Sequence, residues 1–135
     1  MAEALNMLGT RYAMVVHNNG LDEISTTGLT KIAELKDGRI TNKELNAQDL
    51  GIEPADIESL KVADAKASAR IVRDILSGRQ TGPGRDIVVL NASAAIIAGG
   101  LSGNFGSALK LAEASISEGR AMACLEKLVE ISNKA

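Results

Sequence analysis

Aromatic residues are nearly absent from this chain, which has one tyrosine, Tyr12, one phenylalanine, Phe105, and no tryptophan among its 135 residues. Proteins that bind single-stranded nucleic acid without sequence preference stack the bases on exposed aromatic rings. Basic residues are not in excess either, because 15 Lys and Arg stand against 17 Asp and Glu, a formal net charge of −2. We therefore expect no nucleic-acid partner, since the chain offers neither a stacking platform nor a basic face.

Cysteine and long apolar segments are also scarce. The single cysteine, Cys124, cannot form an internal disulfide, and its neighbours in AMACLEKL predict a small buried residue of a helix. The amino-terminal MAEALNML lacks a basic region followed by a long apolar run, and no segment reaches the apolar length that spans a bilayer. We expect no membrane partner and a cytoplasmic location.

Aliphatic residues are what the chain has in place of aromatic ones. Hydrophobic residues make up 45% of the sequence and charged residues 24%, which is typical of a globular protein. A chain of 135 residues is long enough to bury one core. We therefore expect a single α/β domain over residues 1–135, with an aliphatic core.

The pattern of apolar residues predicts strands and helices along the whole chain. Tyr12–His17 and Ile87–Leu90 are apolar without alternation, which is typical of strands buried on both faces of a parallel sheet. The Asp37-Gly38 pair predicts a β-hairpin over residues 30–45. Short helical turns are expected over residues 46–60, and helices over residues 3–8, 64–77, 92–98, 104–117 and 120–132. Together these elements predict an α/β fold with a partial parallel sheet, flanking helices and a β-hairpin.

The stretch HNNGLDE, residues 17–23, follows the first predicted strand. In open α/β folds, ligands bind beyond the carboxyl ends of the parallel strands. Two adjacent carboxylates in a loop can both turn toward one site, whereas in a strand they would point to opposite faces. Mg²⁺ prefers oxygen ligands and takes one or two carboxylates together with water and substrate phosphates. Asp22 and Glu23 are therefore candidate Mg²⁺ ligands.

Alternative interpretations of these polar residues stay open. From the residues alone, Asp22 is also a candidate cap of a turn or helix, and Glu23 a solvated acid of a first helical turn. His17 ends a predicted strand, where it either forms structural hydrogen bonds or acts as an acid or base. The glycine-rich segments at residues 81–84 and 99–106 lack the spacing of a phosphate loop or a dinucleotide fingerprint, so we expect helix ends and turns there.

Three segments in order resemble one enzyme family. They are VVHNNGLDEISTTGLTKIAELKDGRI, DAKASARIVRDILSG and GPGRDIVVLNASAAI, and they are similar to the carboxyl-terminal part of the anthranilate phosphoribosyltransferases, from about residue 8 to the last helix. The resemblance implies transfer of the phosphoribosyl group of 5-phosphoribosyl 1-pyrophosphate (PRPP) to anthranilate with Mg²⁺, in tryptophan biosynthesis. It also implies that Asp22 and Glu23 bind Mg²⁺ beside PRPP, in the large domain of a phosphoribosyltransferase/nucleoside phosphorylase-like fold.

Some residues depart from the pattern of that family. Asn18 stands where glycine is common, Leu29 where proline is common, Val62 and Ala63 replace frequent glycines, and Ser68 stands where asparagine is usual. These changes affect loop geometry more than charge, so they bear on substrate positioning before metal binding.

Other parts of the family pattern have no counterpart in this sequence. Family members are more than twice as long, and their glycine-rich diphosphate loop and Lys-His-Gly-Asn-Arg stretch do not occur here. We therefore expect a fragment that has no catalytic or cofactor-binding residue of its own apart from the metal ligands, and that is inactive alone. We expect it to self-associate or to pair with the missing amino-terminal part. The alternatives are a non-catalytic interaction or regulatory module and a nucleoside phosphorylase-like relative.

Overall fold

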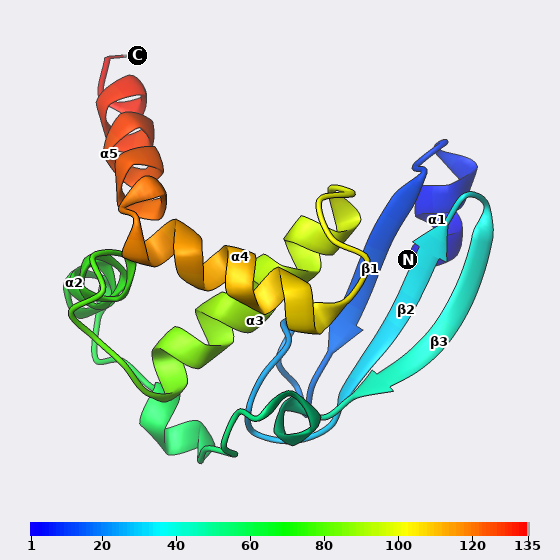
Figure 1. Cartoon of the computed structure of the whole chain (residues 1–135), viewed down its shortest axis with the longest axis horizontal. Helices are drawn as coiled ribbons and strands as arrows, with labels where there is room; N and C mark the ends of the chain where they lie inside the picture. Colours follow the sequence, from blue (N-terminus) through cyan, green and yellow to red (C-terminus); the bar gives the residue numbers. More distant parts are fainter. Residues whose placement is uncertain (135) are drawn as a thin grey trace.

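A three-stranded antiparallel sheet is built by the amino-terminal part of the chain, and helices follow it (Figure 1). The structure is a computed structural model and describes residues 1–134. Its elements in chain order are α1 (Ala2–Met7), β1 (Tyr12–His17), β2 (Thr30–Lys36), β3 (Arg39–Leu45), the 3-10 turns η1 (Ala47–Leu50) and η2 (Ile57–Leu60), α2 (Ala65–Leu76), α3 (Pro83–Ala98), α4 (Phe105–Ser117) and α5 (Arg120–Ser132).

The β-hairpin predicted over residues 30–45 is confirmed. β2 and β3 pair antiparallel, with Lys36 opposite Arg39 at the turn. Asp37 and Gly38 form the turn and have φ values of 46° and 82°. Two positive φ values in a two-residue turn match the right-handed twist of the flanking strands, which explains why Asp-Gly stands there.

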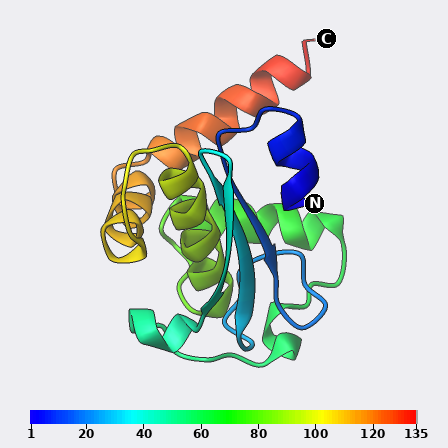
Figure 2. The ribbon, with the colours of Figure 1, turned by 90° about the vertical axis from the view of Figure 1, so that its right-hand side faces the viewer.

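The prediction of a parallel sheet is wrong for the residues that the structure describes. The bounds Tyr12–His17 are confirmed for β1, but β1 pairs antiparallel with β2 and lies at the edge of the sheet. Its residues are half-buried, with His17 exposed, and not buried on both faces. An apolar run indicates that a strand is shielded from water, but it does not indicate whether the neighbouring strand runs parallel or antiparallel to it. Figure 2 shows the sheet edge-on, with α3 and α4 on one side and α1 on the other.

The second predicted strand, Ile87–Leu90, is also wrong, because these residues lie within α3. Pro83 occupies the first turn of this helix, where its missing N–H costs nothing. α3 is the central helix, and Val89 and Leu90 are 2% and 0% exposed. A helix buried on several sides has no polar face, so a short β-branched segment of it resembles a strand. The predicted helix over residues 92–98 is the second half of α3.

The other predicted helices and the short turns over residues 46–60 are confirmed, and side-chain caps explain the starts of η1, η2, α2 and α4. The carboxylate of Asp64 accepts a hydrogen bond from the Ala67 N–H at 2.7 Å, and the Asn104 side chain accepts one from the Ser107 N–H at 2.9 Å.

The prediction that Cys124 is buried is wrong, since it is exposed on α5. This helix projects from the rest of the molecule (Figure 1), so its apolar residues are poorly covered; Leu128 is 64% exposed.

The hydrophobic core lies between the sheet and α3. Its central cluster is formed by Ile24, Ala47, Leu90 and Ala94, and β1 residues that point to the same side pack against it. A second cluster joins α3 to α4. The core therefore holds the loop that carries Ile24 against α3, which is the feature that positions the candidate site.

The carboxylate of Glu34 is buried on β2. The hydroxyl of Tyr12 donates to Glu34 at 2.6 Å, and Lys43 forms an ion pair with the same carboxylate. The hydrogen bonds from Lys43 and then from Tyr12 hold the pKa of Glu34 below its usual range. Burial, followed by the hydrogen bond to Glu34, raises the pKa of Tyr12 to about 12. The charge is tolerated because it is paired and hydrogen-bonded.

Within residues 1–134, none of the helices has both the length and the apolar character needed to cross a bilayer.

Candidate metal centre

The loop between β1 and β2, residues 18–29, begins with a tight backbone turn. The Asn18 N–H donates to the Leu21 carbonyl at 3.0 Å, and the Leu21 N–H donates to the Asn18 carbonyl at 2.7 Å. Asn19 and Gly20 lie between them with φ values of 44° and 89°, and asparagine and glycine are the residues that adopt this conformation most readily. The HNNG segment thus reverses the chain immediately before the two acids.

The side chain of Asn18 ties the start of this loop to its end. It is fully buried, and its amide donates to the Gly28 carbonyl at 2.8 Å and to the Thr30 hydroxyl at 2.9 Å. Its oxygen accepts a hydrogen bond from the Thr27 hydroxyl at 3.0 Å. The amide therefore has partners on both its oxygen and its nitrogen, as a buried polar group requires. The asparagine that departs from the usual glycine is thus an integral part of this loop.

Asn91 on α3 holds the middle of the same loop. The Ile24 N–H donates to the Asn91 side-chain oxygen at 2.9 Å, and the Asn91 side-chain nitrogen donates to the Ile24 carbonyl at 2.7 Å. The side chain of Ile24 is fully buried against Leu90 and Ala94. Glu23 directly precedes this doubly anchored residue.

The two acids lie together on the loop without a protein cation. Asp22 is exposed and Glu23 is half-buried. Within residues 1–134, neither carboxylate takes part in an ion pair. Neither residue lies in a helix or caps one, so the helix-cap and first-turn interpretations are wrong. Burial, and after it the charge of Asp22, raises the pKa of Glu23. The arrangement concentrates negative charge that the described residues do not neutralise.

The chemistry of these residues fits part of a divalent-cation site. A cation between the carboxylates of Asp22 and Glu23 would remove the repulsion that raises the pKa of Glu23. The hydroxyl of Thr26, in the same loop, is buried and has no partner within the described residues, so it calls for a water molecule or a ligand atom. Residues 1–134 contain no group of three or more metal-ligating side chains. Mg²⁺ suits such an incomplete set because it keeps waters and binds substrate phosphates.

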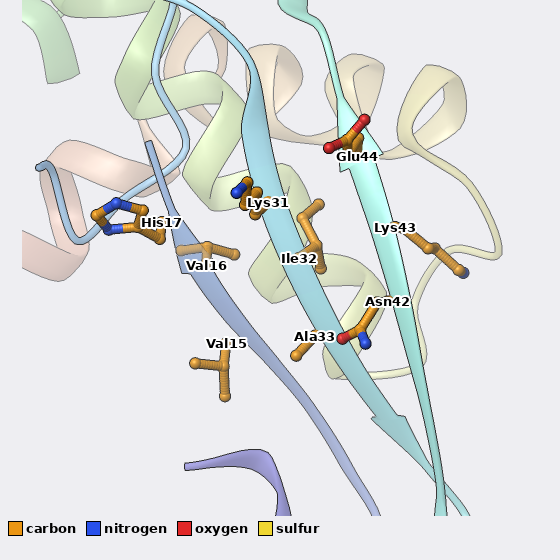
Figure 3. A pocket seen from close by; sticks show the side chains of 9 residues that line it. All are labelled: Val15, Val16, His17, Lys31, Ile32, Ala33, Asn42, Lys43 and Glu44. Atoms are coloured by element: carbon orange, nitrogen blue, oxygen red, sulfur yellow. The ribbon is translucent and has the colours of Figure 1, made fainter. Parts of the chain in front are cut away.

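His17 lies at the end of β1, on the open face of the sheet, and not with the acids. Its ring nitrogen Nε2 accepts a hydrogen bond from the Gly20 N–H at 3.5 Å, a structural contact within the turn. Figure 3 shows it at the end of an open depression of about 730 Å³ that is lined by residues of all three strands. Asp22 and Glu23 do not line this depression. The geometry therefore favours the structural interpretation of His17.

Asn18 and Asn91 form the hydrogen bonds that hold this loop, and sequence reasoning missed both contacts. Asn91 stands in an apolar stretch, VVLNASAA, and an amide in such a stretch needs hydrogen-bond partners when the helix is buried. The sequence therefore indicates that Asn91 needs a partner, but that partner, Ile24, lies 67 residues earlier in the chain. Only the packed structure identifies it.

Known proteins resemble this chain in sequence. The model of the family described as "Glycosyl transferase family, a/b domain" matches residues 1–122. The anthranilate phosphoribosyltransferase of Methanocorpusculum labreanum is 46% identical over 132 residues, which cover 98% of this chain and 38% of the relative. That of Rubrobacter xylanophilus is 42% identical over 135 residues, covering 99% of this chain and 40% of the relative. The chain thus spans about two fifths of the length of these relatives.

Solved structures share the fold. The anthranilate phosphoribosyltransferase of Thermus thermophilus superposes with a TM-score of 0.84 at 32% identity, covering 96% of this chain and 38% of that one. The enzyme of Saccharomyces cerevisiae in complex with PRPP and Mg has a TM-score of 0.82 at 23% identity, covering 92% of this chain and 36% of that one. The predicted α/β class and the predicted resemblance are confirmed. With its family model matched over residues 1–122, the chain belongs to the glycosyl transferase family, a/b domain.

Proposed function

We propose that this chain is the metal-binding part of an anthranilate phosphoribosyltransferase of tryptophan biosynthesis. That enzyme transfers the phosphoribosyl group of PRPP to the amino group of anthranilate and releases pyrophosphate. Relatives of that name match nearly the whole chain, at 46% and 42% identity. The observation that carries the proposal is the pair Asp22 and Glu23, held on a fixed loop with no cation from residues 1–134 beside it.

Asp22 and Glu23 are the residues that would hold Mg²⁺ together with PRPP. The bound ion would neutralise charge on the departing pyrophosphate while the ribose becomes cationic. The metal ion would therefore contribute more to the rate than a general base would. The chain's own contribution is to hold the loop that carries both carboxylates, which Asn18 and Asn91 do through hydrogen bonds to its backbone. The remaining substrate contacts belong, in this proposal, to the part of the relatives that this chain does not span.

The unprotected edge of β1 is the surface that would receive that additional part. Residues Tyr12–Val16 carry no charge, whereas β3 at the other edge carries Arg39, Lys43 and Glu44. Charged side chains protect a sheet edge against pairing, and an apolar edge invites it. We propose that the additional part pairs with β1, that the chain self-associates in its absence, and that the assembled enzyme is cytoplasmic.

The direct test is the loss of anthranilate fluorescence in the presence of PRPP and Mg²⁺. The 135-residue chain is assayed alone and then mixed with the amino-terminal part of the Methanocorpusculum labreanum enzyme. Activity in the mixture only is expected. Activity of the chain alone would show that it holds a full site, and no activity in either assay would favour a non-catalytic interaction module.

The metal assignment is tested in the same mixture with Asp22→Asn and Glu23→Gln. Each change removes one carboxylate charge and keeps the side-chain volume, so each is expected to lower kcat/KM about 100-fold, the effect of losing one group that stabilises charge in a transition state. Glu126→Gln, an exposed acid on α5, is the control and is expected to have no effect. Unchanged activity of both loop variants would remove the assignment.

A further inference from the structure

The backbone of Ile24 forms two hydrogen bonds with a side chain of α3. Both its N–H and its carbonyl pair with one side chain, the amide of Asn91, at 2.9 and 2.7 Å. The same side-chain nitrogen donates to the Ile87 carbonyl of α3 at 2.9 Å. The oxygen and both N–H bonds of the amide therefore have partners, and its orientation is fixed because a flipped amide would face donor with donor and acceptor with acceptor.

This contact bears on the acids because of its place in the chain. Ile24 follows Glu23 directly, and its side chain is fully buried beside Leu90, the residue that precedes Asn91 on α3. Helix and loop are thus joined by packing and by paired hydrogen bonds at the same point. A loop that carries two adjacent like charges relaxes by moving them apart, and an anchored backbone at Ile24 opposes that movement.

We propose that Asn91 is a positioning residue for the metal site formed by Asp22 and Glu23, acting through the backbone of Ile24. The inference rests on the proposed function of these acids as metal ligands. Groups that orient metal ligands without touching the metal affect affinity by about 10–100-fold. Loss of the Asn91 amide is expected to weaken metal binding by an amount in that range, although Asn91 contacts neither carboxylate.

The 135-residue chain offers a matched control on the same helix. Ser93 is buried, and its hydroxyl donates to the Val89 carbonyl at 2.7 Å, one helical turn back, as the Asn91 amide does to Ile87. Ser93→Ala removes a buried hydrogen bond within α3 and leaves the loop contact in place. Asn91→Leu keeps the number and branching of the side-chain heavy atoms and removes the loop contact, and Asn91→Ala is a second variant that leaves room for water.

The measurement is the dissociation constant of Mn²⁺, a paramagnetic substitute for Mg²⁺, from the EPR signal of the free ion. Thermal unfolding of each variant and the exchange rate of the Ile24 amide proton are recorded beside it. We expect Asn91→Leu and Asn91→Ala to speed that exchange and to weaken Mn²⁺ binding about 10–100-fold, and Ser93→Ala to do neither. In a Glu23→Gln background, Asn91→Leu should weaken binding by a smaller factor than in the wild type, since one of the two ligands that it orients is gone.

The outcomes separate this inference from the proposed function. If Asp22→Asn and Glu23→Gln weaken Mn²⁺ binding while folded Asn91 variants bind like the wild type, Asn91 is only structural and the inference is overturned. If the loop-acid variants also bind like the wild type, the metal site itself is wrong. An equal loss of affinity in Ser93→Ala and the Asn91 variants would assign the effect to α3 stability and also overturn the inference.

Discussion

The proposed role of Glu23 as a metal ligand opposes its contribution to stability, because a metal ligand must be charged and the folded chain disfavours the charged form. Burial and the neighbouring charge of Asp22 raise its pKa above the ordinary value of 4.5. The folded state therefore binds this proton more tightly than the unfolded state does. Stability from this group is full below the ordinary pKa and is lost as the pH rises through the raised value.

We therefore predict that Glu23→Gln stabilises the metal-free chain at pH 7, by an amount of about 1 kcal/mol or less, as expected for a partly solvated charge. The gain should disappear below the ordinary pKa of 4.5, where the wild-type side chain is protonated too. Thermal unfolding of both proteins at pH 7 and at acidic pH gives the measurement. A Glu23→Gln variant that is less stable than the wild type at pH 7 would contradict the assigned cause of the shift.

The two acids could be identified from sequence as candidate ligands because they are adjacent and lie next to a predicted strand end. The hydrogen bonds that hold the loop around them could not be predicted. Asn18 pairs with residues 10 and 12 positions later, and Asn91 with a residue 67 positions earlier. Local spacing predicts which groups can act as ligands, whereas the hydrogen bonds that hold them depend on how the loop packs against α3.

Among the elements, the β2–β3 hairpin depends most directly on its local sequence. Gly38 has a φ of 82°, which an L-residue with a Cβ adopts only with strain. Gly38→Ala is predicted to lower the free energy of unfolding by about 1 kcal/mol. Gly103→Ala is the control, because Gly103 lacks such a φ and an added Cβ would meet no atom within 4 Å. Equal stability of the two variants in denaturant titrations would contradict the turn argument.

The hairpin and α3 show why some elements are predictable and others are not. Asp37 and Gly38 specify their turn through backbone conformation alone, so two residues are enough. Residues 87–90 are apolar, and the first three are β-branched, because they fill the interior, and that requirement is the same for a buried strand and a buried helix. The start of α3 at Pro83 and its continuation to Ala98 distinguish the two, since 16 residues is too long for an ordinary strand.

For the molecule as a whole, the uncovered part is the side of the sheet that holds Val15. α1 covers one end of that face, and the rest lines the open depression (Figure 3). We predict that the isolated chain self-associates through β1 and that Val15→Lys shifts it toward monomer, since a charge on an edge strand opposes pairing. Size exclusion with light scattering measures this, with Val72→Lys on α2 as the control. A wild-type chain that elutes as a compact monomer would contradict the prediction.

The position of Ile24 links the interior of the molecule to its acidic loop. Its side chain belongs to the central cluster with Leu90 and Ala94, and its backbone carries the contact that fixes Glu23. The loop is therefore not an appendage that can be exchanged while the scaffold stays as it is. Grafting these acids onto another scaffold would require the matching stretch of α3 as well, and a change in the size of Leu90 would move Ile24 and the two acids that precede it.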